Sequence, residues 1–243
     1  MEVKINYLYN SAFSVETPRY LLIFDYYLDS VDGGNKVVSN GAVGEEDLIT
    51  EKNIMVFSSH SHADHFNPII LQWKNVNSNI KYILSSDINI GETSESINKI
   101  SAYEELQIGE VSIKAFGSTD IGVSFLVRVE GISIFHAGDL NCWYWWDEPE
   151  EQNKKAEVWF KEEIEKIKEE NIDIAFFPVD SRLKDYYSLG PKYFIEKLKP
   201  KSLIPMHFRE DFGITQSFKK NVDYSFTQVE VIDIRGQQLL IEI

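Results

Sequence analysis

Three of the five histidines of this chain fall within six residues, in the segment Ser59-His60-Ser61-His62-Ala63-Asp64-His65. A short apolar run, residues 53–57, comes directly before this segment and predicts a buried strand. Imidazole nitrogens and carboxylate oxygens bind divalent metals, and an extended backbone points alternate residues to the same side. A polar loop with incidental histidines is the simpler alternative. Donors crowded at the end of a strand instead predict a metal site on a rigid scaffold.

The other apolar runs predict a layered α/β fold. Strands are expected at residues 3–8, 13–16, 20–25, 81–84, 111–116, 123–129, 132–135, 172–179 and 202–206. Helices are expected at 68–73, 150–171 and 191–199, and the strands 229–234 and 239–243 are expected to close the chain as a hairpin. The glycine-rich segment 29–47 has no periodicity, so it is either a mobile connector or one wall of a substrate cleft.

Length, composition and charge limit the partners of this chain. With 243 residues, 43% of them hydrophobic, it can form one large core, and a single domain over 1–243 is expected. A net charge of -15 argues against a nucleic acid or an anionic membrane as the main partner. Cys142 is the single cysteine, and no apolar run is long enough to cross a membrane. A cytoplasmic location is therefore expected.

Further candidate ligands follow other apolar runs. Asp139 comes after a glycine at the end of the run 132–135, where its carboxylate can bridge two cations, although a turn-forming aspartate is the alternative. His207, the last histidine, also follows a predicted strand. Asp25 ends the run 20–25, where a buried carboxylate needs a partner, and we expect it to orient a metal-bound imidazole.

Together these residues resemble the metallo-β-lactamase superfamily. The matching pieces, in the order of the family, are Asp25, the H-x-H-x-D-H motif from His60 to His65, the pair Gly138-Asp139, and His207. The resemblance implies a four-layer αββα sandwich with one or two divalent transition metals that activate water. Within the superfamily the chain looks most like hydrolases related to bacterial ascorbate-phosphate lactonases.

One piece of the family pattern is missing. The family places another histidine between the motif and the Gly-Asp pair, but residues 116–122 contain none. Asp120 is the candidate replacement for it, with water as the alternative. The resemblance thus implies a depleted first site and an intact second one. The first site would contain His60, His62 and Asp139, and the second would contain Asp64, His65, Asp139 and His207. Zinc is the leading metal, and an oxygen-richer set favours manganese or iron.

The resemblance also assigns roles. Asp64 and His207 are expected to be catalytic as ligands, with Asp64 also orienting the nucleophile, whereas His136 is expected beside the site as a supporting residue. Weaker candidates for binding a small, potentially anionic substrate are Trp143, Arg182 and Arg209.

Three functions compete at this stage. The leading hypothesis is a metal-dependent hydrolase of a lactone, ester or phosphoester. The missing histidine motivates the alternative of a non-catalytic metal- or ligand-binding module on a degenerate hydrolase scaffold. A nuclease is the third, and the acidic composition argues against it.

Overall fold

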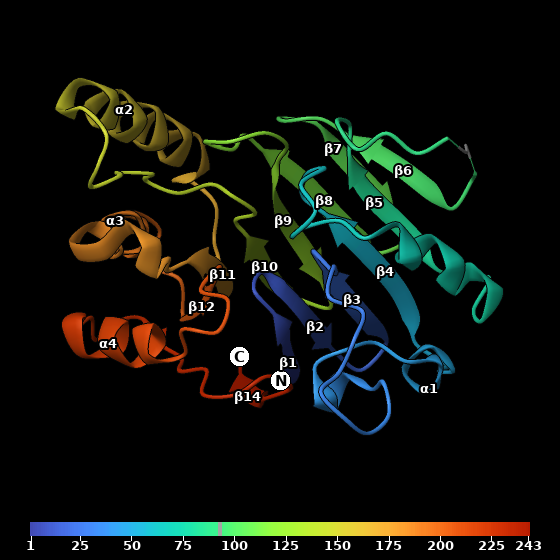
Figure 1. The fold of residues 1–243 in the computed structure, drawn as a ribbon. Helices are drawn as coiled ribbons and strands as arrows, with labels where there is room; N and C mark the ends of the chain where they lie inside the picture. The colour runs from blue at the N-terminus through green and yellow to red at the C-terminus, as the bar shows by residue number, and fades with distance from the viewer. Residues whose placement is uncertain (92–93) are drawn as a thin grey trace. The chain divides into compact units, whose positions relative to one another are not determined.

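The computed structural model describes residues 1–91 and 94–243. The chain divides into two compact units, Met1–Ile100 with Asp233–Ile243, and Ser101–Ile232. Each unit contains one mixed β-sheet and helices, which confirms the α/β class (Figure 1). No helix among the described residues combines the length and apolar character needed to span a membrane.

The first unit is built on a sheet whose described strands follow the order β14-β1-β2-β3-β4-β5-β6. The strands are β1 (Glu2–Tyr9), β2 (Ala12–Glu16), β3 (Tyr20–Phe24), β4 (Asn53–Ser58), β5 (Lys81–Ser85), β6 (Ile97–Ile100) and β14 (Gln238–Glu242). The short helices of this unit are η1 (Val38–Asn40), α1 (Glu45–Leu48) and η2 (Pro68–Asn75). Strands β3 to β6 run parallel, and β3 and β4 are apolar along most of their length, as buried parallel strands require. Phe24 pairs with Phe57, so the segments after β3 and β4 leave the sheet side by side.

The second unit has a sheet in the order β13-β12-β11-β10-β9-β8-β7. Its strands are β7 (Glu105–Ile108), β8 (Val111–Phe116), β9 (Ser124–Val129), β10 (Ile132–His136), β11 (Ile174–Pro178), β12 (Ser202–Met206) and β13 (Gln228–Val229). Its helices are α2 (Glu150–Ile167), η3 (Ser181–Tyr186), α3 (Leu189–Leu198) and α4 (Gly213–Asn221). Strands β10, β11 and β12 are parallel neighbours, and therefore their carboxyl ends lie at one edge of this sheet.

The segment 29–47 is organised rather than structureless, because it contains η1 and α1. Arg235, near the end of the chain, donates hydrogen bonds to the carbonyl oxygens of Leu8, Leu28, Ser30 and Gly41. A Cβ atom at position 41 would lie 2.4 Å from Cγ of Arg235, so glycine is needed there. Residues from this segment and η2 line a cavity of about 740 Å³ within the first unit. These contacts favour the wall of a cavity over a mobile connector.

The expected hairpin at the end of the chain is wrong. β13 is short and pairs parallel with β12 in the second sheet, whereas β14 pairs antiparallel with β1 in the first sheet. Ile232, which lies between β13 and β14, is held through its backbone by the hydroxyl of Thr215 in α4. Alternation of apolar residues identifies a strand but not the strand with which it pairs. The strands expected at 229–234 and 239–243 are neighbours in sequence, yet they do not pair with each other. The sequence reading also missed β6, β7 and α4, which are short or largely polar.

The buried carboxylate of Asp173 ties β10 to the start of β11. Its Oδ2 accepts hydrogen bonds from the backbone N–H and the hydroxyl of Ser133 at 2.8 and 2.7 Å. Its Oδ1 lies 2.9 Å from Nζ of Lys201. Burial alone would raise the pKa of Asp173, but the hydrogen bonds from Lys201 and Ser133 outweigh burial and lower it.

We expect the Asp173→Asn variant to lose about 1–3 kcal/mol of unfolding free energy near neutral pH. Because the pKa of Asp173 is lower in the folded state, its stabilisation is complete above the unfolded-state pKa and disappears as the pH falls through the folded-state pKa. Urea unfolding at about pH 7 and about pH 3 should therefore show the gap between variant and parent shrinking in acid. Asp223→Asn, at an exposed site, is the control and should change stability little. A gap that widens in acid would contradict this account.

Candidate metal centre

The histidine loop of the first unit begins where β4 ends and is anchored on Asp25, directly after β3. The backbone N–H and the hydroxyl of Ser59 both donate to the Asp25 carboxylate at 2.7 Å. Nδ1 of the fully buried His65 lies 2.8 Å from Oδ2 of Asp25. With its Nδ1–H held by a carboxylate, His65 carries its lone pair on Nε2, the arrangement typical of a metal-ligating histidine.

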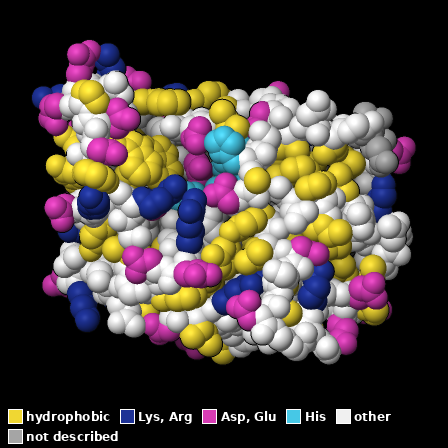
Figure 2. All heavy atoms as spheres, viewed as in Figure 1, with side chains coloured by type: hydrophobic (Ala, Val, Ile, Leu, Met, Phe, Trp, Pro, Cys, Tyr) yellow, Lys and Arg dark blue, Asp and Glu magenta, His cyan; other side chains and the backbone are white. Residues whose placement is uncertain are grey.

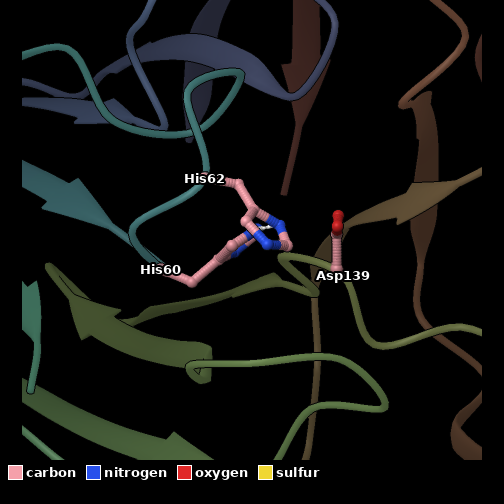
Figure 3. Close-up of side chains that lie close together, drawn as sticks. All are labelled: His60, His62 and Asp139. Atoms are coloured by element: carbon pink, nitrogen blue, oxygen red, sulfur yellow. Dashed lines mark hydrogen bonds between the residues drawn. The ribbon is translucent and has the colours of Figure 1, made fainter. Parts of the chain in front are cut away.

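His60 is oriented through the same carboxylate. Ser59 Oγ, which donates to Asp25, lies 3.0 Å from Nδ1 of His60 and can accept a hydrogen bond from the N–H there. That tautomer leaves the lone pair of His60 on Nε2, which lies 3.1 Å from Nδ1 of His62. Figure 3 shows the rings of His60 and His62 directed toward each other from the segment after β4. Two nitrogens bound to one tetrahedral zinc at about 2.0–2.1 Å would lie about 3.4 Å apart, so this pair has nearly the spacing of shared ligands.

Asp64 and the middle of the loop are held by other segments of the first unit. Oδ2 of Asp64, which is half-buried, lies 3.4 Å from Nδ2 of Asn10 and 4.0 Å from Nε2 of His65. The backbone N–H of Ser61 donates to Asp87, beyond the end of β5, at 2.8 Å. Burial by itself would raise the pKa of Asp87, but hydrogen bonds from serines, including Ser61, lower it.

The second unit collects three polar residues, one after each of its neighbouring parallel strands. Asp139 follows β10, Asp180 follows β11 and His207 follows β12. Nε2 of His207 lies 3.3 Å from Oδ1 of Asp139, and its Nδ1 lies 2.9 Å from Oδ2 of Asp180. All three are buried. Asp180 is thus related to His207 as Asp25 is to His65.

The charge of Asp180 is maintained by its partners. Burial would raise the pKa of Asp180, but hydrogen bonds from His207 and Arg182 outweigh it and bring the pKa to about 2. Arg182 donates from Nε to both carboxylate oxygens at 3.0 and 2.9 Å. An ionised Asp180 favours the His207 tautomer that has its lone pair on Nε2.

Three of the eight described non-glycine residues with a positive φ belong to the candidate site or support it. Asn10, Asp25 and His207 have φ angles of 55°, 44° and 63°, in the left-handed region that non-glycine residues rarely adopt. Such conformations persist where the surrounding structure holds them, and they gather at functional sites.

Hydrogen bonds with Thr119 and His136 hold the loop that carries Asp139. Oγ1 of Thr119 accepts from the backbone N–H of Asn141 at 2.9 Å and lies 2.7 Å from its carbonyl oxygen. His136, the buried last residue of β10, accepts from the N–H of Gly138 at 3.2 Å. Figure 3 shows Asp139 on this loop.

Near the position of the missing histidine, Asp120 is exposed, and its Oδ1 accepts from the N–H of Ile121 at 2.8 Å. Ser118, also in this stretch, accepts from the N–H of Asp120 at 3.2 Å. At least one oxygen of the expected replacement ligand is therefore engaged within its own turn.

The three weaker candidates differ in their surroundings. Trp143 donates from Nε1 to the carbonyl oxygen of Asp139 at 2.9 Å, and its ring lies 5.5 Å from that of His207. Arg182 contacts Asp180 and also lies 3.4 Å from Nδ1 of His207. Arg209 is exposed, two residues after His207.

The prediction from sequence missed several residues that hold the candidate ligands in place. Asp180 is the most important of them. Its signal was available, because Asp180 follows a buried apolar strand just as Asp25 does. Asn10, Asp87 and Thr119 carry no comparable signal, since each contributes through a hydrogen bond to a segment distant in sequence.

Comparisons with known proteins place these residues in context. No family model matches the chain. A UPF0173 metal-dependent hydrolase of Opitutus terrae is 23% identical over 231 residues, covering 86% of each chain. Another, from Pyrococcus furiosus, is 24% identical over 220 residues, covering 85% of this chain and 84% of the relative.

Solved structures show the same fold. Igni18, described as a metallo hydrolase of Ignicoccus hospitalis, matches with a TM-score of 0.63 at 15% identity and 100% coverage of both chains. The metallo-β-lactamase fold protein YhfI of Bacillus subtilis matches with a TM-score of 0.62 at 15% identity, covering 98% of this chain and 99% of the other. The fold type expected from the sequence is thereby confirmed.

Proposed function

We propose that this chain, which has the fold of a metallo-β-lactamase fold protein and is similar in sequence to UPF0173 metal-dependent hydrolases, is a metal-dependent hydrolase of a small lactone, ester or phosphoester. The general class, a metal-dependent hydrolase, is the one to which its sequence relatives are assigned. The substrate range is our proposal, and so is the lactonase-like branch of the superfamily.

One observation carries the proposal. In each unit a buried aspartate after one parallel strand holds Nδ1 of a buried histidine after the next strand: Asp25 holds His65, and Asp180 holds His207. Buried carboxylate–imidazole pairs of this kind support metal ligands, because they set the tautomer and raise the basicity of the coordinating nitrogen. Hydrophobic packing within the two units does not account for a buried aspartate–histidine pair at the same place in both.

From the order of the motifs in the sequence, we propose one metal centre within a single domain over residues 1–243. Its ligands are His60, His62, Asp64, His65, Asp139 and His207. The donors fit divalent transition metals, since imidazole and carboxylate suit zinc, manganese and iron alike. Zinc is the leading choice. The lack of a histidine in residues 116–122 supports a weaker first site.

When bound, the metal supplies an activated water and a Lewis acid for the scissile carbonyl or phosphoryl group. The chain supplies orientation. Asp25 and Asp180 hold His65 and His207 in the coordinating tautomer, and Arg182 keeps Asp180 ionised. Asp64, whose Oδ2 accepts a hydrogen bond from Asn10, would serve as a ligand and orient the nucleophile.

The test combines metal analysis with a substrate panel. Protein stripped with a chelator and reloaded separately with zinc, manganese or iron is assayed on a lactone, a carboxylic ester and a phosphodiester. We expect turnover of at least one class only after reloading, with one ion retained through dialysis and a second lost more readily. Turnover that survives complete metal removal would contradict the proposal. A single tightly held ion without turnover of any panel member would favour the non-catalytic binding module.

A further inference from the structure

A run of aromatic residues follows directly on the Asp139 loop and remains partly exposed. The rings of Trp143 and Trp145 are nearly parallel, with an angle of 8° and centroids 5.9 Å apart. Trp146 is 51% exposed. The segment thus changes from buried residues, Asp139 to Cys142, through half-buried Trp143 and Trp145 to an exposed Trp146.

Two cations lie on these rings. The guanidinium of Arg182 is 5.5 Å from the centroid of Trp145, and Nζ of Lys184 is 3.0 Å from the centroid of Trp146. Lys184 has φ 52° and ψ −123°, a conformation that costs a non-glycine residue free energy. Figure 2 shows basic side chains beside a broad hydrophobic area over the part of this face where α2 and α3 lie.

The aromatic run is connected to the candidate ligands within the second unit. Trp143 donates to the backbone of Asp139, and its ring lies against His207. Arg182, the cation on Trp145, also lies beside His207. A group that rests on Trp145 is therefore close to His207, which is proposed to hold the metal.

We propose that Trp145, Trp146 and Lys184 form a substrate subsite for a flat aromatic group that carries a carboxylate or phosphate. This inference rests on the proposed hydrolase function. Indole faces stack on planar rings, which accounts for the aromatic part. Lys184 accounts for the anionic part, because Arg182 is already paired with Asp180 and an anion needs local positive charge to approach a chain with a net charge of -15.

The test measures equilibrium binding to the metal-loaded protein by calorimetry. The aromatic probes are 2-naphthoate and 2-naphthyl phosphate, and their non-aromatic counterparts are acetate and inorganic phosphate. We expect at least one aromatic anion to bind about tenfold or more tightly than its counterpart, and the two arms tell carboxylate from phosphate. Equal affinities in both arms would overturn the subsite.

Matched variants assign the effect to the subsite. Trp146→Leu should weaken the aromatic probe about tenfold, whereas Trp159→Leu, the same change at a tryptophan 45% exposed on α2, should not. Lys184→Met should weaken the anionic probes, and Lys168→Met, at an ion-paired lysine just after α2, should not. If neither Trp146→Leu nor Lys184→Met weakens binding of the probes, the inference is overturned.

The outcomes separate this inference from the proposed function. Binding of the aromatic anion without hydrolysis of any substrate contradicts the hydrolase and leaves the subsite. Hydrolysis with no aromatic preference overturns the subsite alone. Light scattering on Trp146→Leu provides a further check, because a change from dimer to monomer would identify the exposed indole as a contact between copies and overturn the inference.

Discussion

Replacing His207 by alanine is expected to release metal and to lower hydrolysis by more than about 100-fold. The reason is that this change removes a ligand itself, whereas loss of a residue that only supports a ligand already costs about 10- to 100-fold. It also leaves the buried carboxylates of Asp139 and Asp180 without their common imidazole. Metal content after dialysis and the rate on the best panel substrate measure the two effects.

His136→Gln is the matched control for this prediction. His136 is also buried at the carboxyl end of a strand, but it contacts the backbone of Gly138 and the ring of Phe176. We expect this variant to lose stability and to retain its metal. A His136 variant that loses metal while the His207 variant keeps it would reverse the two assigned roles.

The second large effect is expected from the supporting aspartates. Asp25→Asn and Asp180→Asn should each lower metal affinity by about 10- to 100-fold. A carboxylate accepts hydrogen bonds at both oxygens, whereas an amide presents a donor on one side. In the Asp25 variant this donor would face either Ser59 or His65 and favour the wrong tautomer of the histidine.

Asp173→Asn is the control for this pair, since Asp173 is also a buried aspartate that accepts hydrogen bonds from a serine. It should lower stability without changing metal affinity. Competition with a chromophoric chelator gives the affinities, and urea unfolding gives the stabilities. If all three variants weaken metal binding equally, the effect comes from general destabilisation and not from orientation of the imidazoles.

The strands that carry the candidate site were predicted well from their apolar runs. The run before the histidine loop became β4, and the runs before Asp139 and His207 became β10 and β12. Buried parallel strands can be recognised in a sequence as continuous apolar runs, because both of their faces are apolar. The predictions failed where this signal is weak, as in the strand pairing at the end of the chain and in the four-residue strands β6 and β7.

The donor atoms of this protein, and their positions just after apolar strands, were determined by the sequence alone. Which aspartate holds which histidine was decided only by the tertiary structure. Asp25 and His65 are 40 residues apart, and Asp180 and His207 are 27 apart. The physical reason is that parallel strands align their carboxyl ends only after the sheet has formed. A hydrogen bond of 2.8 or 2.9 Å between such distant residues therefore depends on register and not on local preference.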